Sequence, residues 1–173
     1  MNEQLLATTG LATGWLDRRA YPDLPAEAER ALRAAALCWQ RDEEAEVNLE
    51  RARELAPDHV AVLIARYRYL LYKHRFSEAR EAAIRCLATA AALLEVPRDF
   101  RQVLPTHADF GAMNPDVRFW LFTLQAYGYV SLRAGHTEEG RAALEHLAAL
   151  DTADQTKTRV LIQVIAAADR PDD

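Results

Sequence analysis

The sequence lacks most of the residues and motifs from which enzymes and metal proteins build a site. Its two cysteines, Cys38 and Cys86, are far apart and belong to no CxxC pair, which argues against a redox motif or a cysteine-rich metal site. Glycine and proline number only six and seven, and no glycine-rich phosphate loop, GxSxG or HExxH motif occurs. We therefore expect a protein that is not an enzyme and that uses no cofactor and no metal.

Strong positive charge and long apolar runs are absent as well. The formal net charge is −5, whereas nucleic-acid-binding proteins are typically basic. The most apolar stretch, residues 119–132, is too short to cross a bilayer and contains Gln125. The first residues, MNEQLLATTG, do not resemble a secretory signal. Together with the reduced state expected for the cysteines, these absences predict a cytoplasmic protein that binds neither nucleic acid nor membrane.

Alanine and leucine dominate the composition, while valine, isoleucine and threonine are sparse. Half of the 173 residues are hydrophobic, which is enough to bury a sizeable core in one domain. This balance favours helices over strands, and we predict an all-α fold.

Three similar tripeptides divide the helical pattern into units. They are Glu43-Glu44-Ala45, Ser77-Glu78-Ala79 and Glu138-Glu139-Gly140, of which the first two are offset by 34 residues. The third is displaced further, by a longer helix and an insertion over residues 95–115. A period of 34 residues built from two helices is typical of the tetratricopeptide repeat (TPR).

Over residues 26–152, apart from the insertion, the chain resembles a TPR protein. Small residues open the second helix of each unit, as the family requires: Ala45, Ala79 and Gly140. The family's small residue midway along the first helix is replaced by Arg33 and Tyr67, and only Gly128 complies. The resemblance implies a right-handed α-α superhelix of about three helical hairpins, with flanking N- and C-terminal helices.

We expect a single TPR-like domain with these parts: an N-terminal helix and linker (1–25), repeats at 26–57, 58–94 and 116–152, the insertion, and a capping helix (153–169). The insertion carries large apolar side chains, including Phe100 and Phe110, and we expect it to fold back on the aromatic helix around Trp120. A lid over the groove is the functional alternative. Ser77 and Thr137 are predicted N-caps, and Gly135 a left-handed helix end.

The resemblance places a binding groove along the first helices of the hairpins. The partner-binding positions that it implies are Arg30, Arg68, Tyr72, Gln125, Tyr129 and Arg133. Arginine and tyrosine are common in the most important contacts of interfaces. Residues 66–75 also contain four basic side chains with no acidic residue between them, which is either a solvated face or part of the groove. We predict a protein or peptide partner, with acidic side chains or a C-terminal carboxylate.

Other readings of the sequence remain open. One is a self-assembling homodimer, in which an N-terminal leucine and tryptophan stripe pairs with the end helix. Another is a small TPR-type chaperone of a bacterial secretion or nitrogen-fixation system. The hinge at Tyr72–Arg75 and the helix containing Tyr127-Gly128-Tyr129 resemble TPR-like proteins of nitrogen-fixing bacteria, although this implies no mechanism. His107 and Asp109 in the insertion are too few for a structural metal, and we interpret them as loop residues.

Overall fold

Seven α-helices account for most of the computed structural model, which describes residues 23–168. They are α2 (Ala26–Leu37), α3 (Asp42–Leu55), α4 (Val60–Tyr72), α5 (Phe76–Leu94), α6 (Pro115–Arg133), α7 (Thr137–Leu150) and α8 (Thr158–Ala168), with a 3-10 helix, η1 (Phe100–Gln102), in the insertion. No strand occurs in the described part of the chain, so the predicted all-α class is confirmed. The predicted N-terminal helix lies outside the described residues.

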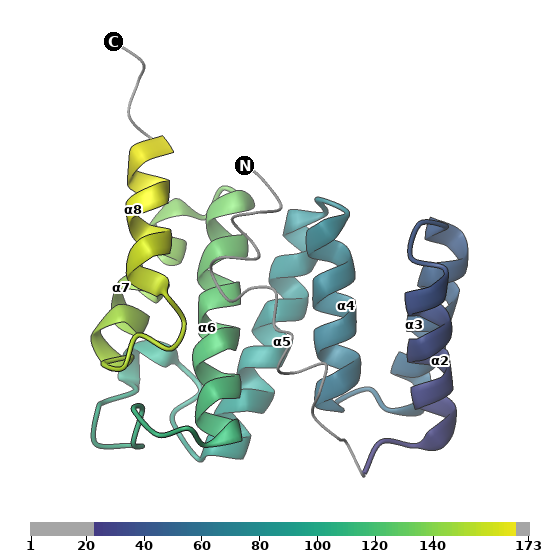
Figure 1. Ribbon diagram of the computed structural model, residues 1–173, viewed down its shortest axis with the longest axis horizontal. Coiled ribbons are helices and arrows are strands. Elements are labelled where there is room, and N and C mark those ends of the chain that lie inside the picture. The colour runs from purple at the N-terminus through teal and green to yellow at the C-terminus, as the bar shows by residue number, and fades with distance from the viewer. Residues whose placement is uncertain (1–22, 169–173) are drawn as a thin grey trace.

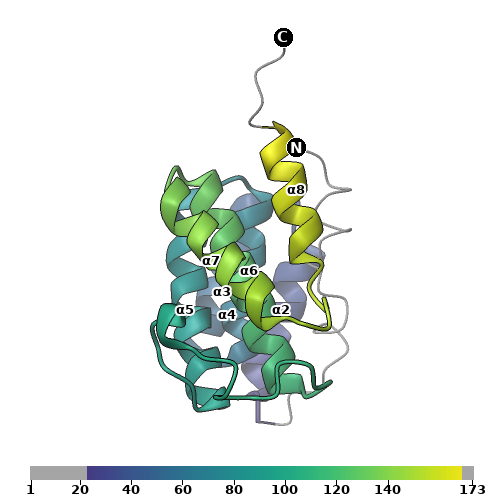
Figure 2. The same cartoon turned by 90° about the vertical axis from the view of Figure 1, so that its left-hand side faces the viewer.

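The helices follow one another along the long axis of the molecule as hairpins with short turns (Figure 1). The pairs are α2–α3, α4–α5 and α6–α7. Helix α6 packs closely against both α5 and α7, and the main core extends from these helices to α2, α3 and α4. Figure 2 shows α8 beside α6 and α7 at the C-terminal end of the row.

Each of the three similar tripeptides lies in the first turn of the second helix of a hairpin. Their last residues, Ala45, Ala79 and Gly140, are buried against the preceding helix. A small side chain at this point lets the two helices approach each other closely, which explains why the sequence repeats it.

Two of the predicted helix caps are wrong, Ser77 by two residues and Thr137 by one. Helix α5 begins at Phe76 rather than after Ser77, because His74 already adopts the left-handed conformation (φ 58°) and turns the chain earlier. Thr137 is likewise the first residue of α7 and not its cap. Gly135 does have a positive φ of 87°, as predicted.

The insertion folds back on the helices, as the sequence predicts. Phe100, Val103 and Phe110 are buried, and the Phe110 ring lies 5.4 Å from the ring of Trp120 in α6. The imidazole Nε2 of His146 in α7 lies 3.0 Å from the Val103 carbonyl oxygen. The insertion therefore belongs to the core around α6 and α7.

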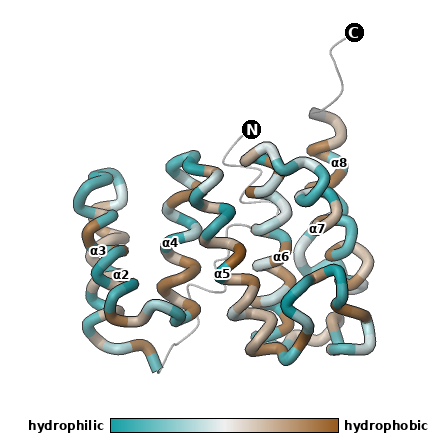
Figure 3. The backbone as a smooth tube through the Cα atoms, turned by 180° about the vertical axis from the view of Figure 1, so that it is seen from behind, coloured by the Kyte–Doolittle hydropathy of each residue, from teal (hydrophilic) through white to brown (hydrophobic). Residues whose placement is uncertain are grey.

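The first hairpin contributes Ala35, Cys38, Ala45 and Leu49 to the main core, and it forms a second, small cluster with α4. Buried alanines from both helices surround Val62 of α4: Ala28, Ala31, Ala52 and Ala56. Figure 3 shows hydrophobic stretches along α4, α5 and α6, whereas much of α3 is hydrophilic. The α2–α3 pair consequently contacts α4 only along a narrow seam, while the later helices pack broadly.

Candidate functional site

A cleft of about 480 Å³ lies between α2 and α4, where the first helices of two hairpins face each other. Its walls are mostly apolar. They are formed by Leu32, Ala35, Ala36 and Trp39 from α2 and the turn after it, Leu49 from α3, and Ala65, Arg68 and Tyr72 from α4. The cleft thus combines apolar side chains, two aromatic residues with polar edges, and one guanidinium group.

Trp39 is the aromatic centre of this cleft. Its ring makes edge contacts with Tyr69 at 5.3 Å and with Tyr72 at 6.1 Å between ring centroids. We did not predict Trp39 as a site residue. The signal was present, since Leu32, Ala35 and Trp39 continue one helical stripe past the end of α2.

The structure brings together two of the six predicted partner-binding residues, Arg68 and Tyr72, which both line the cleft. Arg30 is exposed on α2, outside the lining of the cleft, and its guanidinium lies 3.9 Å from the Glu27 carboxylate. Arg30 therefore lies on α2, which forms one wall of the cleft, but its side chain is not part of that wall.

The other predicted positions are part of the protein's own packing. Gln125 is fully buried, and its Nε2 donates hydrogen bonds to the Thr156 carbonyl oxygen (2.7 Å) and to Thr158 Oγ1 (3.1 Å). Tyr129 is only 3% exposed. Neither side chain can contact a partner, and their assignment to a groove surface is wrong because residues 151–158 pack over Gln125 and the core encloses Tyr129.

Arg133 is half-buried and held by two neighbours. Its guanidinium stacks on the Phe76 ring at 4.2 Å from the centroid and donates a hydrogen bond of 3.0 Å to the hydroxyl of Tyr129. These contacts connect α6 to the start of α5. Arg133 is therefore a structural contact between hairpins.

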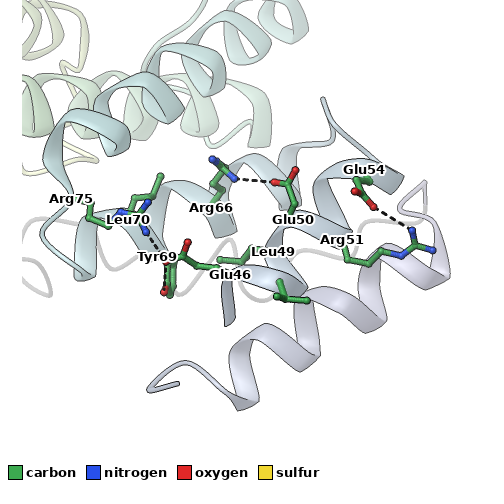
Figure 4. A pocket seen from close by; sticks show the side chains of 10 residues that line it. Glu46, Leu49, Glu50, Arg51, Glu54, Arg66, Tyr69, Leu70 and Arg75 are labelled. Atoms are coloured by element: carbon green, nitrogen blue, oxygen red, sulfur yellow. Dashed lines mark hydrogen bonds and ion pairs between the residues drawn. The ribbon is translucent and has the colours of Figure 1, made fainter. Parts of the chain in front are cut away.

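A second cleft, of about 530 Å³, lies between α3 and α4 and is drawn in Figure 4. Its lining alternates acidic and basic side chains over an apolar base: Glu46, Val47, Leu49, Glu50, Arg51, Glu54, Arg66, Tyr69, Leu70 and Arg75. Arg66 points toward Glu50 across the seam (3.5 Å), and Arg75 reaches Glu46 (2.6 Å).

Acidic residues of α3 therefore pair with most of the basic run in residues 66–75. Besides Arg66 and Arg75, Lys73 pairs with Asp42 at 2.5 Å. Of the four basic side chains, only Arg68 lines the cleft between α2 and α4, and the other three pair with α3. The signal that could have predicted this pairing is the spacing of Asp42, Glu46 and Glu50, which share one face of α3.

The ion pairs and burial shift several pKa values in this region. The hydrogen bond from Arg53 holds the pKa of Glu50 below its ordinary value, and the one from Arg75 does the same for Glu78. Burial, with the nearby Glu46 carboxylate, raises the pKa of Tyr69 to about 12. The carboxylates thus stay charged and Tyr69 stays neutral near pH 7.

No group of three or more metal-ligating side chains that could hold an ion occurs in residues 23–168. In the insertion, His107 Nδ1 accepts a hydrogen bond from the Leu104 amide, and Asp109 accepts one from the Gly111 amide. Both side chains stabilise loop turns, as we interpreted them. Nor does any helix in this range have the length and apolar character needed to cross a membrane.

One known protein is clearly similar to this chain. It comes from Azotobacter chroococcum mcd 1, is described as "Uncharacterized 19.8 kDa protein in nifW 5'region", and is 35% identical over 124 residues, which is 70% of either chain. This chain belongs to the family of that protein. No protein-family model matches the chain, and no solved structure shows a significant match.

Proposed function

We propose that this protein is a TPR-like binding module that holds a segment of a partner protein in the cleft between α2 and α4. The proposal is carried by the meeting of Trp39, Tyr72 and Arg68 in one largely apolar cleft. Tryptophan, tyrosine and arginine are the residues most often found at the energetic centre of interfaces. The order of the hairpins and the 34-residue offset between the first two support the TPR-like arrangement.

The lining of the cleft indicates the chemistry of the bound segment. An apolar side chain of the partner would pack between Trp39 and Ala65, where aromatic and aliphatic surface is available. A neighbouring carboxylate, from an acidic residue or a C-terminus, would accept hydrogen bonds from Arg68. We therefore propose a short segment with one large apolar residue beside a carboxylate.

Fluorescence anisotropy with labelled peptides tests this directly. One set carries a single Phe or Leu flanked by Asp and Glu, and the matched set carries Lys in place of the acids. We expect the acidic set to bind, and Arg68→Glu to weaken that binding about tenfold or more, because it turns an attractive contact into a repulsive one.

Arg30→Glu is the matched control, since it makes the same charge change on α2 outside the lining of the cleft. Binding by this variant should equal that of the unaltered protein. Equal binding of acidic and basic peptides, or equal losses in the Arg68 and Arg30 variants, would show that the cleft is not the binding site.

A narrower proposal concerns the cellular location and the partner protein. Because the relative lies in a nifW 5′ region, we propose that this protein works in the cytoplasm of a bacterium as a chaperone-like partner of a nitrogen-fixation protein. Titration with the purified nifW product should show saturable binding that Arg68→Glu weakens. Absence of binding would reject this partner, while the peptide experiment would still test the cleft.

The alternative to partner binding is a self-assembling homodimer. Light scattering over a range of concentrations separates the two, since a homodimer gains mass with concentration and a binding module does so only when its partner is added.

A further inference from the structure

The two clefts lie on opposite sides of the same seam between the first hairpin and α4. Leu49 of α3 lines both of them. By contrast, α6 is packed along its length by α5 and α7. The first hairpin is therefore the least firmly attached of the three.

One end of the seam has the features of a pivot. The hairpin is joined to α4 through Ala56–His59, and beside this link Val62 packs among small alanine side chains. Each alanine methyl group buries little apolar area, and partly buried Leu24, Leu32 and Leu55 complete this small cluster. The His59 side chain begins α4 by accepting a hydrogen bond from the Ala61 amide (3.1 Å), which keeps the helix start fixed next to the link.

The opposite end of the seam is held by charged groups. Lys73 pairs with Asp42 at 2.5 Å, and Arg75 pairs with Glu46 at 2.6 Å. The hydroxyl of Tyr69 donates to Glu46 Oε1 (3.3 Å), and the Lys73 ammonium lies over the Tyr69 ring. Figure 4 shows Arg75, Tyr69 and Glu46 gathered at this end of the cleft.

We propose that the α2–α3 hairpin is a hinged arm, which turns about Ala56–His59 and is latched to α4 by the Asp42–Lys73 and Glu46–Arg75 ion pairs. The latch controls the peptide cleft, because Trp39 stands on the arm while Arg68 and Tyr72 stand on α4. The control of peptide binding by the latch rests on the proposed function, whereas the hinge of the α2–α3 hairpin does not.

The strength of the two ion pairs in the latch should depend on the salt concentration. The ion-paired side chains are partly exposed, with Asp42 60% and Glu46 48% accessible. At an ionic strength of about 0.15 M, charges in contact with solvent are screened over roughly 8 Å, so added salt weakens these pairs. The arm should therefore open more often as ionic strength rises.

Hydrogen exchange followed by mass spectrometry tests the hinge without any ligand. The unlatched variant is Asp42→Asn with Glu46→Gln. Its matched control is Glu43→Gln with Glu44→Gln, which removes the same charge from the same end of α3 and breaks the Glu44–Arg41 pair within the hairpin, but no pair with α4. We expect exchange in α2 and α3 to become about fivefold to tenfold faster in the unlatched variant, the effect of two modest ion pairs.

Exchange in α6 and α7 should stay unchanged, and the control should match the unaltered protein throughout. Unchanged exchange in α2 and α3 would overturn the hinge, and so would an equal increase in all helices, which would mean general destabilisation. A peptide titration separates the two proposals. If no peptide binds but amide exchange in α2 and α3 is faster in the unlatched variant, the hinge is supported and the proposed binding function is rejected.

If peptide binds with the same affinity to the latched and unlatched proteins, although the arm exchanges faster, the cleft does not depend on the arm. That result would overturn the proposal that the latch regulates peptide binding. We expect instead that the unlatched variant binds the acidic peptides more weakly, by the factor by which the population of the closed arm falls.

Discussion

Helices α6 and α7 meet backbone to backbone at Gly128 and Gly140. A Cβ atom added to Gly140 would lie 2.7 Å from the Gly128 carbonyl oxygen, and one added to Gly128 would lie 3.2 Å from the Gly140 carbonyl oxygen. The equivalent second-helix positions in the earlier hairpins hold Ala45 and Ala79. The third hairpin is therefore packed so closely that even alanine does not fit.

Gly140→Ala should destabilise the protein by about 1–3 kcal/mol, because the new methyl group would press on backbone atoms and on Leu132. Thermal unfolding would show a lower midpoint. An ordinary helical glycine replaced by alanine gains about 0.5–1 kcal/mol instead. A raised midpoint would mean that the helices are not in this close contact.

Tyr67 and Tyr69 form a matched pair for a test of buried hydroxyl groups. The Tyr67 hydroxyl is buried and finds no hydrogen-bond partner among the described residues, whereas the Tyr69 hydroxyl donates to Glu46. Tyr67→Phe should leave the free energy of unfolding unchanged or raise it by up to about 1 kcal/mol, because it removes an unsatisfied polar group. Tyr69→Phe should lower it by about 1 kcal/mol.

Urea unfolding of both variants measures the difference. If Tyr67→Phe costs as much as Tyr69→Phe, the Tyr67 hydroxyl makes a hydrogen bond that the structure does not show.

Gln125 connects α6 to the segment that leads into α8. Its Nε2 bonds with Thr156 and Thr158, next to the buried Asp151 carboxylate, which accepts hydrogen bonds from the Thr156 amide and hydroxyl. Gln125→Met keeps the volume but removes the donor, and should cost about 1–3 kcal/mol. We also expect faster amide exchange in α8. Gln163→Met, at an exposed position on α8, is the control and should change neither quantity.

Glu139 makes stability depend on pH in the acid range. The hydrogen bond from the Tyr127 hydroxyl (2.6 Å), followed by that from Arg101 (3.2 Å), holds the pKa of Glu139 below its ordinary value of 4.5. Because the folded state binds the proton less tightly than the unfolded state, the stabilisation is complete above that ordinary value. It is lost as the pH falls through the lower, folded pKa.

Glu139→Gln should therefore lower the free energy of unfolding near neutral pH and reduce its decline on acidification. Urea unfolding at a series of pH values checks this, with the neighbouring Glu138→Gln as a surface control. If acidification destabilises the Glu139 variant as steeply as the unaltered protein, other carboxylates account for the effect.

The helical hairpins could be predicted from the sequence because their signals are local. Alanine-rich stripes and the recurring small residues at Ala45, Ala79 and Gly140 place the helices and the turns between them. The folding back of the insertion was also predictable, since Phe100 and Phe110 have no other way to leave water. Helix starts were less accurate, because the left-handed His74 has no distinctive sequence signal.

Only part of the candidate site was predictable, because the site depends on contacts between distant segments. Arg68 and Tyr72 follow from the helical register, yet Gln125 is hidden by a loop some thirty residues further along the chain. The charges of residues 66–75 likewise depend on which residues of α3 face them.

By itself, then, the sequence determined the helical elements, their order in hairpins and the small residues at their crossings, since each of these depends on neighbours within a few turns. Only the tertiary structure decided which faces stay open. It buries Gln125 and Tyr129, pairs Lys73 with Asp42, and brings Trp39 to Arg68 and Tyr72. The physical reason is that burial and ion pairing depend on which segments pack together, and many arrangements of the same helices share one local pattern.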